Sequence, residues 1–109
     1  MAKTFHLDLG PLGFEEQWAD LRDPKYMTQR RVEELSATMR DIEGNPKAAE
    51  DFLRSQVAAW HVLDGDSGEP LGDPTEADLG GLPLGITSAI SQTINELFTA
   101  TVPNALRKS

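Results

Sequence analysis

The stretch TFHLDL, residues 4–9, decides the fold class because its apolar and polar residues alternate strictly. Alternation of this kind predicts a β-strand with one buried face, here carrying Phe5, Leu7 and Leu9. A lone strand cannot satisfy its backbone N–H and C=O groups, so a second strand has to pair with it. We therefore expect a β-hairpin at the N-terminal end of the chain.

The partner strand is expected within residues 14–22, which follow the turn-forming sequence GPLG at residues 10–13. Phe14, Trp18 and Leu21 would also fit a helical stripe. As a strand, the segment places Ala19 and Leu21 on one face. We favour the strand because it supplies the pairing that residues 4–9 need.

Two helices are predicted between residues 28 and 61. Thr28 is a suitable N-cap for the first helix, and Asn45 with Pro46 opens the second after the break at residues 44–46. The apolar stripes are Val32, Leu35, Met39 and Ile42 in the first helix, and Ala49, Phe52, Leu53, Gln56, Val57 and Trp60 in the second. The second stripe predicts a helix that continues to about His61, with Trp60 buried against the last helix. The pair is expected to form an αα-hairpin.

The remainder of the chain predicts a turn region and a closing helix. Residues 64–70 (DGDSGEP) are turn-forming, and a helix of about sixteen residues is expected between Pro83 and Pro103. Residues 104–109 are expected to be a frayed tail. The fold class that follows is α+β in a single domain, residues 1–109: a small N-terminal β-hairpin with three main helices, mostly helical.

Composition excludes several classes of protein. The chain has ten basic and eighteen acidic residues, which give a net charge of -8, and it contains no cysteine. Nucleic acid and anionic membranes are therefore not expected as partners, because both require clustered Lys and Arg. Disulfides and thiolate metal sites are ruled out by the cysteine count. No segment has the length of continuous apolar sequence that a membrane helix needs.

No catalytic constellation is present, so we expect a protein that is not an enzyme and has no cofactor. His6 and His61 are the only histidines, and neither stands in a recognisable catalytic or metal-binding spacing. Asp64, Asp66 and Gly68 resemble the start of a calcium loop. However, position six of that loop is Glu69 instead of glycine, and position twelve is Thr75 instead of glutamate. We expect an acidic turn without a metal; a small calcium- or ligand-binding module is the alternative.

The closing helix offers a candidate partner-binding surface. Its apolar stripe consists of Ile86, Ile90, Ile94, Leu97 and Phe98. Packing of this stripe into the core is one interpretation. The other is binding to an apolar helix of another protein, for which part of the stripe would stay accessible or be covered by a second copy of the chain.

Several short motifs resemble the tail-assembly chaperones of long-tailed (siphovirus-type) phages and prophages of actinobacteria. They are WHVLDGDSGEPL at residues 60–71, Pro74-Thr75, LPL at residues 82–84, and WADLRDP at residues 18–24 followed by Tyr26-Met27. The resemblance extends over roughly residues 5–98, almost the whole chain.

The resemblance implies a non-enzymatic protein of the host cytoplasm that binds the tape-measure protein during tail assembly and helps to recruit tail-tube subunits. It supplies no catalytic residue to carry over, and no partner-binding residue that can be mapped onto this chain. A structural virion protein, such as a connector or minor tail component, is the alternative; it would be found in the mature particle.

Overall fold

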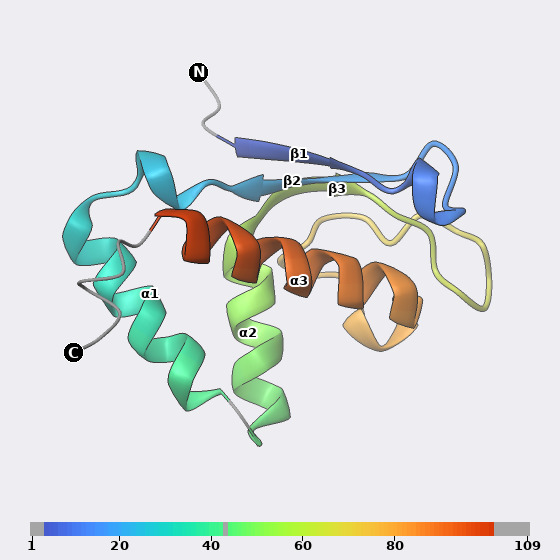
Figure 1. Cartoon of the computed structure of the whole chain (residues 1–109). Helices are drawn as coiled ribbons and strands as arrows, with labels where there is room; N and C mark the ends of the chain where they lie inside the picture. Colours follow the sequence, from blue (N-terminus) through green and yellow to red (C-terminus); the bar gives the residue numbers. More distant parts are fainter. Residues whose placement is uncertain (1–3, 43, 102–109) are drawn as a thin grey trace.

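A computed structural model of the chain describes residues 4–42 and 44–101. A three-stranded antiparallel sheet is covered on one face by helices, while its other face is open (Figure 1). The α+β fold class and the N-terminal hairpin are confirmed. The strands are β1 (Thr4–Asp8), β2 (Trp18–Arg22) and β3 (Val57–His61), and the helices are α1 (Gln29–Asp41), α2 (Pro46–Gln56) and α3 (Leu84–Thr101), with short 3₁₀ turns η1 (Gly10–Leu12), η2 (Pro24–Tyr26) and η3 (Leu79–Gly81).

The sheet has the order β1-β2-β3, and its inner face is formed by alternate residues of the strands. Leu7 pairs with Ala19, which in turn pairs with Trp60 on β3. Ala19 and Leu21 of the central strand are fully buried. The strand predicted within residues 14–22 is confirmed at Trp18–Arg22, as is the orientation of Ala19 and Leu21.

The predicted extension of the second helix to His61 is wrong. The helix ends at Gln56, and the next five residues form β3 along the free edge of β2, with a bulge where Asp20 and Leu21 face it. Val57 and Trp60 are nevertheless buried, as predicted. Their spacing fits one face of a helix, but the bulge also lets both side chains point to the inner face of a strand. Hydrogen bonding to β2 decides between the two, and that pairing is invisible in local sequence.

The burial of Trp60 is confirmed, but its setting differs from the prediction. Its side chain projects from β3, and its Nε1 donates a 2.6 Å hydrogen bond to the backbone oxygen of Gly72. This bond ties the sheet to the loop between β3 and η3.

The αα-hairpin of α1 and α2 is confirmed together with its caps. The Thr28 hydroxyl accepts a hydrogen bond from the Arg31 amide at 3.2 Å, and the Asn45 side chain accepts one from the Ala48 amide at 3.2 Å. Gly44 between the helices has a φ of 78°, a left-handed conformation that glycine adopts without strain.

The acidic turn is also confirmed. Leu63 and Pro70 form an isolated antiparallel bridge, and the Asp64 amide donates to the Glu69 oxygen at 2.8 Å across the turn. The turn packs against η3 so closely that a Cβ on Gly81 would collide with the Asp64 carboxylate. A larger residue at position 81 would therefore force the Asp64 carboxylate to shift.

The predicted closing helix corresponds to α3, which lies across the inner face of the sheet (Figure 1). The described buried apolar side chains form one cluster, to which β2, β3 and all three helices contribute, and Leu7 of β1 packs against it. Pro103 and the expected frayed tail, residues 104–109, lie outside the described residues.

Candidate functional site

The stripe predicted for partner binding is mostly part of the core. Ile86, Ile90, Ile94 and Phe98 are all buried, so only Leu97 can supply the accessible part of the stripe that partner binding was expected to use. The reason is that the inner face of the sheet is wholly apolar and has to be covered, and α3 is the helix that lies against it. Leu97 differs, because it packs against the edge of the core and is only partly buried.

Leu97 lines an open depression of about 580 Å³ with a mixed lining of apolar and polar side chains. Three elements form the depression: β1, η2 and the C-terminal end of α3, which meet at one end of the sheet (Figure 1). Its lining residues are Phe5, Asp23, Lys25, Leu97, Ala100 and Thr101. We call this feature the α3 depression.

Local structure explains why these three elements meet. Phe5 lies opposite Leu21 in the β1–β2 ladder, so its side chain points to the helical side of the sheet. Pro24 then ends β2 and starts η2, where Asp23 caps the turn by accepting a 3.1 Å hydrogen bond from the Lys25 amide. The chain thereby turns beyond the end of the sheet, where η2 contacts α3.

The α3 depression combines apolar and charged lining residues. Phe5 is 39% exposed, which is high for an aromatic side chain on the inner side of a sheet. Asp23 and Lys25 carry charges of opposite sign, but Asp23 is only 7% exposed whereas Lys25 is exposed. The Lys25 Nζ lies 5.1 Å from the centre of the Tyr26 ring. Such a site suits apolar side chains.

Sequence reasoning found part of this site. It placed Phe5 on the inward face of a strand and named Leu97 as a partner-binding candidate. It missed Lys25, Ala100 and Thr101. These residues carry no motif, and only the packing of η2 against α3 brings them to Phe5.

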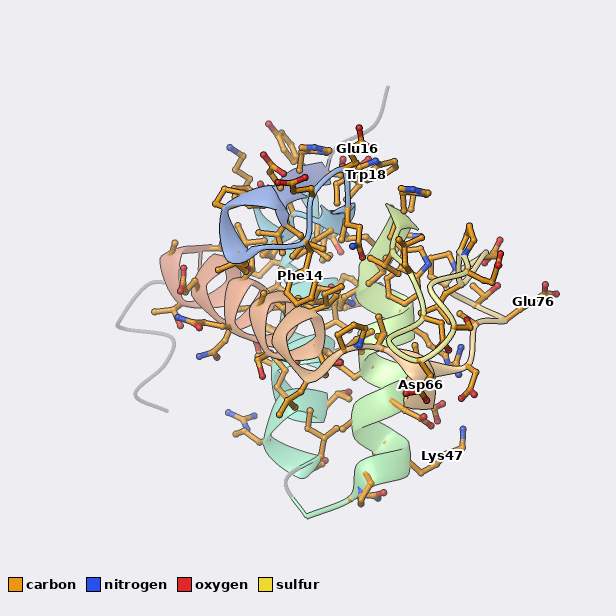
Figure 2. The ribbon with its side chains drawn as sticks, turned by 90° about the vertical axis from the view of Figure 1, so that its right-hand side faces the viewer. Phe14, Glu16, Trp18, Lys47, Asp66 and Glu76 are labelled. Carbon is orange, nitrogen blue, oxygen red and sulfur yellow. The ribbon has the colours of Figure 1, made fainter. Side chains whose placement is uncertain are left out.

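A histidine–aspartate pair lies on the open face of the sheet. His6 Nδ1 is 2.6 Å from Asp20 Oδ1, and the imidazole ring lies 5.5 Å from the ring of Trp18. Figure 2 shows Trp18 on the side of the sheet away from the helices, whereas Phe14 points toward α3. Both partners of the pair are accessible to solvent, so they lack the enclosed setting in which such a pair activates a nucleophile.

The carboxylates of Asp64 and Asp73 accept hydrogen bonds from residues two or three positions further along the chain. The Asp64 side chain accepts hydrogen bonds from the amides of Ser67 and Asp66, and these bonds lower its pKa. The pKa of Asp73 is lowered by hydrogen bonds from the hydroxyl and amide of Thr75. Among residues 4–42 and 44–101, no group of three or more His, Asp or Glu side chains is arranged to hold a metal ion.

Within the same described ranges, no helix has the length and apolar character required to span a membrane.

Comparisons of the chain with protein-family models, with curated proteins and with solved structures found no match. The structure therefore assigns the chain to a fold class: a small α+β domain with a three-stranded antiparallel sheet.

Proposed function

We propose that this protein is a phage tail-assembly chaperone that acts in the host cytoplasm and binds an apolar helical segment of the tape-measure protein. Two features support the proposal. The first is the set of motifs within residues 18–27 and 60–84 that resemble this class of chaperone. The second is the α3 depression, which is the observation that carries the argument for partner binding.

The depression suits an apolar helix in three respects. Phe5 and Leu97 offer accessible apolar surface in its lining, and Ala100 in the same lining has a small side chain. An amphipathic helix presents apolar residues at a spacing that can fill such a groove. The net charge of -8 on the chain disfavours nonspecific aggregation while apolar segments of a partner are being held.

Co-expression with the tape-measure protein encoded beside this chain tests the proposal. Wild-type chain should keep the tape-measure protein in the soluble fraction and co-purify with it. Leu97→Asp places a charge in the depression and should reduce recovery of the complex by about tenfold, the equivalent of about 1.4 kcal/mol. Leu84→Asp is the matched control, because it makes the same change at an exposed position of the same helix outside the depression.

Circular dichroism must first establish that both variants are folded. Equal recovery of the tape-measure protein with the two variants would contradict binding at the α3 depression. Failure of the wild-type chain to bind the tape-measure protein at all would contradict the proposed function.

Mass spectrometry of purified virions separates this function from the alternative of a structural connector or minor tail protein. A chaperone is released before the particle is complete, so its peptides should be absent from virions while those of the tape-measure protein are present. Stoichiometric recovery of this chain from virions would favour the structural role.

A further inference from the structure

The end of the molecule that carries the α3 depression is locally basic, although the chain as a whole has a net charge of -8. Residues 22–31 contain a single acidic side chain, Asp23, and four basic ones, which are Arg22, Lys25, Arg30 and Arg31. Figure 1 shows that η2 and the start of α1 lie at the same end of the molecule as the C-terminal end of α3. A partner seated in the depression therefore lies beside this basic segment.

Two acidic residues belong to the depression or adjoin its lining in the sequence, and both are already hydrogen-bonded. Asp23 is only 7% exposed, and its side chain accepts the 3.1 Å bond from the Lys25 amide. Glu96, the only acidic residue of α3, accepts a 3.1 Å hydrogen bond from Gln92 one turn earlier and is not a lining residue. Neither carboxylate is paired with the ammonium group of Lys25.

Most basic side chains of the segment carry a charge that no carboxylate offsets. Arg31 Nη1 lies 3.6 Å from Glu34 Oε2. In contrast, Arg22, Lys25 and Arg30 form no ion pair within residues 4–42 and 44–101. The positive charge at this end of the molecule is therefore available to a partner.

Lys25 is the basic residue that lines the depression itself. Its side chain is exposed, and its Nζ lies 5.1 Å from the centre of the Tyr26 ring, a favourable contact for a cation. An apolar segment that contacts Phe5 and Leu97 brings its flanking side chains close to this charge. An Asp or Glu at such a flanking position is attracted, whereas a Lys or Arg is repelled.

We propose that the helical segment bound by the α3 depression carries acidic side chains beside its apolar face, and that one of them pairs with Lys25. This pairing rests on the proposed function, which supplies the helical partner, and it specifies the charge of that partner. Phe5 and Leu97 require apolar side chains, so an acidic amphipathic helix fits the surface better than a nucleic acid does.

The acidic character of the whole chain does not prevent this pairing. The acidic turn, residues 64–70, lies at the opposite end of the sheet from the depression (Figure 1). At physiological ionic strength the Debye length is about 8 Å, so exposed charges at that distance are largely screened. The local positive charge of Lys25 then acts on the bound segment more strongly than the distant carboxylates do.

Titration calorimetry with a purified apolar helical segment of the tape-measure protein tests the pairing. Lys25→Glu should weaken binding by about fivefold at low ionic strength, the scale of one exposed ion pair. Lys47→Glu is the matched control and should leave the affinity unchanged, because it makes the same change of charge at the end of α2 away from the sheet (Figure 2). The difference between the two variants should shrink as salt is added. Equal affinities of the two variants, both verified as folded by circular dichroism, overturn the pairing.

A charge exchange identifies the partner residue. Each acidic residue beside the apolar face of the segment is replaced in turn by lysine. At one position the replacement should weaken binding to the wild-type chain and restore binding to Lys25→Glu. The net charge of -8 alone would favour lysine in the segment, so a loss with the wild-type chain requires local pairing. A segment without acidic residues beside its apolar face, or one that tolerates every replacement, overturns the proposal.

The variants also distinguish failure of this pairing from failure of the proposed function. If Leu97→Asp weakens binding relative to Leu84→Asp while Lys25→Glu and Lys47→Glu bind equally well, apolar binding at the depression stands and the acidic partner is wrong. If the wild-type chain binds no segment of the tape-measure protein, the proposed function itself is contradicted.

Discussion

Trp60 is the residue whose replacement tests the packing of the sheet most sharply. It is 9% exposed on β3, between the buried Ala19 on β2 and the loop whose Gly72 oxygen accepts its Nε1 hydrogen bond. Trp60→Ala removes the buried ring and leaves a cavity, which should lower the free energy of unfolding by about 3–5 kcal/mol. That is a large share of the roughly 5–15 kcal/mol that stabilises a typical domain.

Trp60→Phe separates burial from hydrogen bonding. It keeps an aromatic ring but loses the N–H donor, and Gly72 is exposed enough for water to replace the lost bond. The expected cost is therefore near the lower end of the range for a lost buried hydrogen bond, about 1 kcal/mol. The alanine variant should thus cost at least twice as much as the phenylalanine variant.

Urea unfolding followed by far-ultraviolet circular dichroism measures both variants. Fluorescence is less suitable, because Trp18 would remain as the only tryptophan and it lies on the open face. An alanine variant within about 0.5 kcal/mol of wild type, as at an ordinary surface position, would refute the burial argument. Equal costs for the two variants would assign the stabilisation to the hydrogen bond instead.

Three further predictions use the same packing. Gln56→Met should raise the free energy of unfolding by about 1 kcal/mol in urea, because it removes a buried side-chain oxygen that has no hydrogen-bond partner among the described residues. Ile90→Asp should abolish the cooperative thermal transition, since Ile90 is fully buried, whereas Leu97→Asp should melt within a few degrees of wild type. Carboxyl NMR titration should give Asp64 and Asp73 pKa values below the ordinary 3.8. Their stabilising contribution is therefore complete above that pH and is lost as the pH falls through the lowered values, and Asp64→Asn should reduce this acid-dependent loss.

Features encoded in short stretches of sequence were predictable. The alternation at residues 4–9 identified β1, and Thr28 and Asn45 marked the starts of α1 and α2 because capping depends on only three or four neighbouring residues. Turn chemistry in residues 64–70 was equally local.

Features that depend on distant pairing were not predictable in the same way. The spacing of Val57 and Trp60 fits a helix as well as a bulged strand. Residues 57–61 form a strand because they pair with the free edge of β2. The stripe of α3 could serve the core or a partner. Which of the two applies depends on how much of the apolar sheet surface, such as that of Leu21, a helix has to cover.

The candidate site was only half predictable for the same reason. Phe5 and Leu97 were each assigned a plausible face from local periodicity, but they are 92 residues apart in the sequence. Lys25 lies beside them only because Pro24 ends β2 and starts η2, which packs against α3. A depression built from three separate segments has no signature in any one of them.

The most direct test of the account is an NMR titration of the ¹⁵N-labelled chain with a purified apolar helical segment of the tape-measure protein. We predict that the largest shift changes map to the α3 depression, at Phe5, Lys25 and Leu97, with little change on the open face of the sheet. Changes centred instead on Trp18 and His61 would contradict binding at the depression, and a spectrum unchanged at saturating segment would contradict tape-measure binding itself.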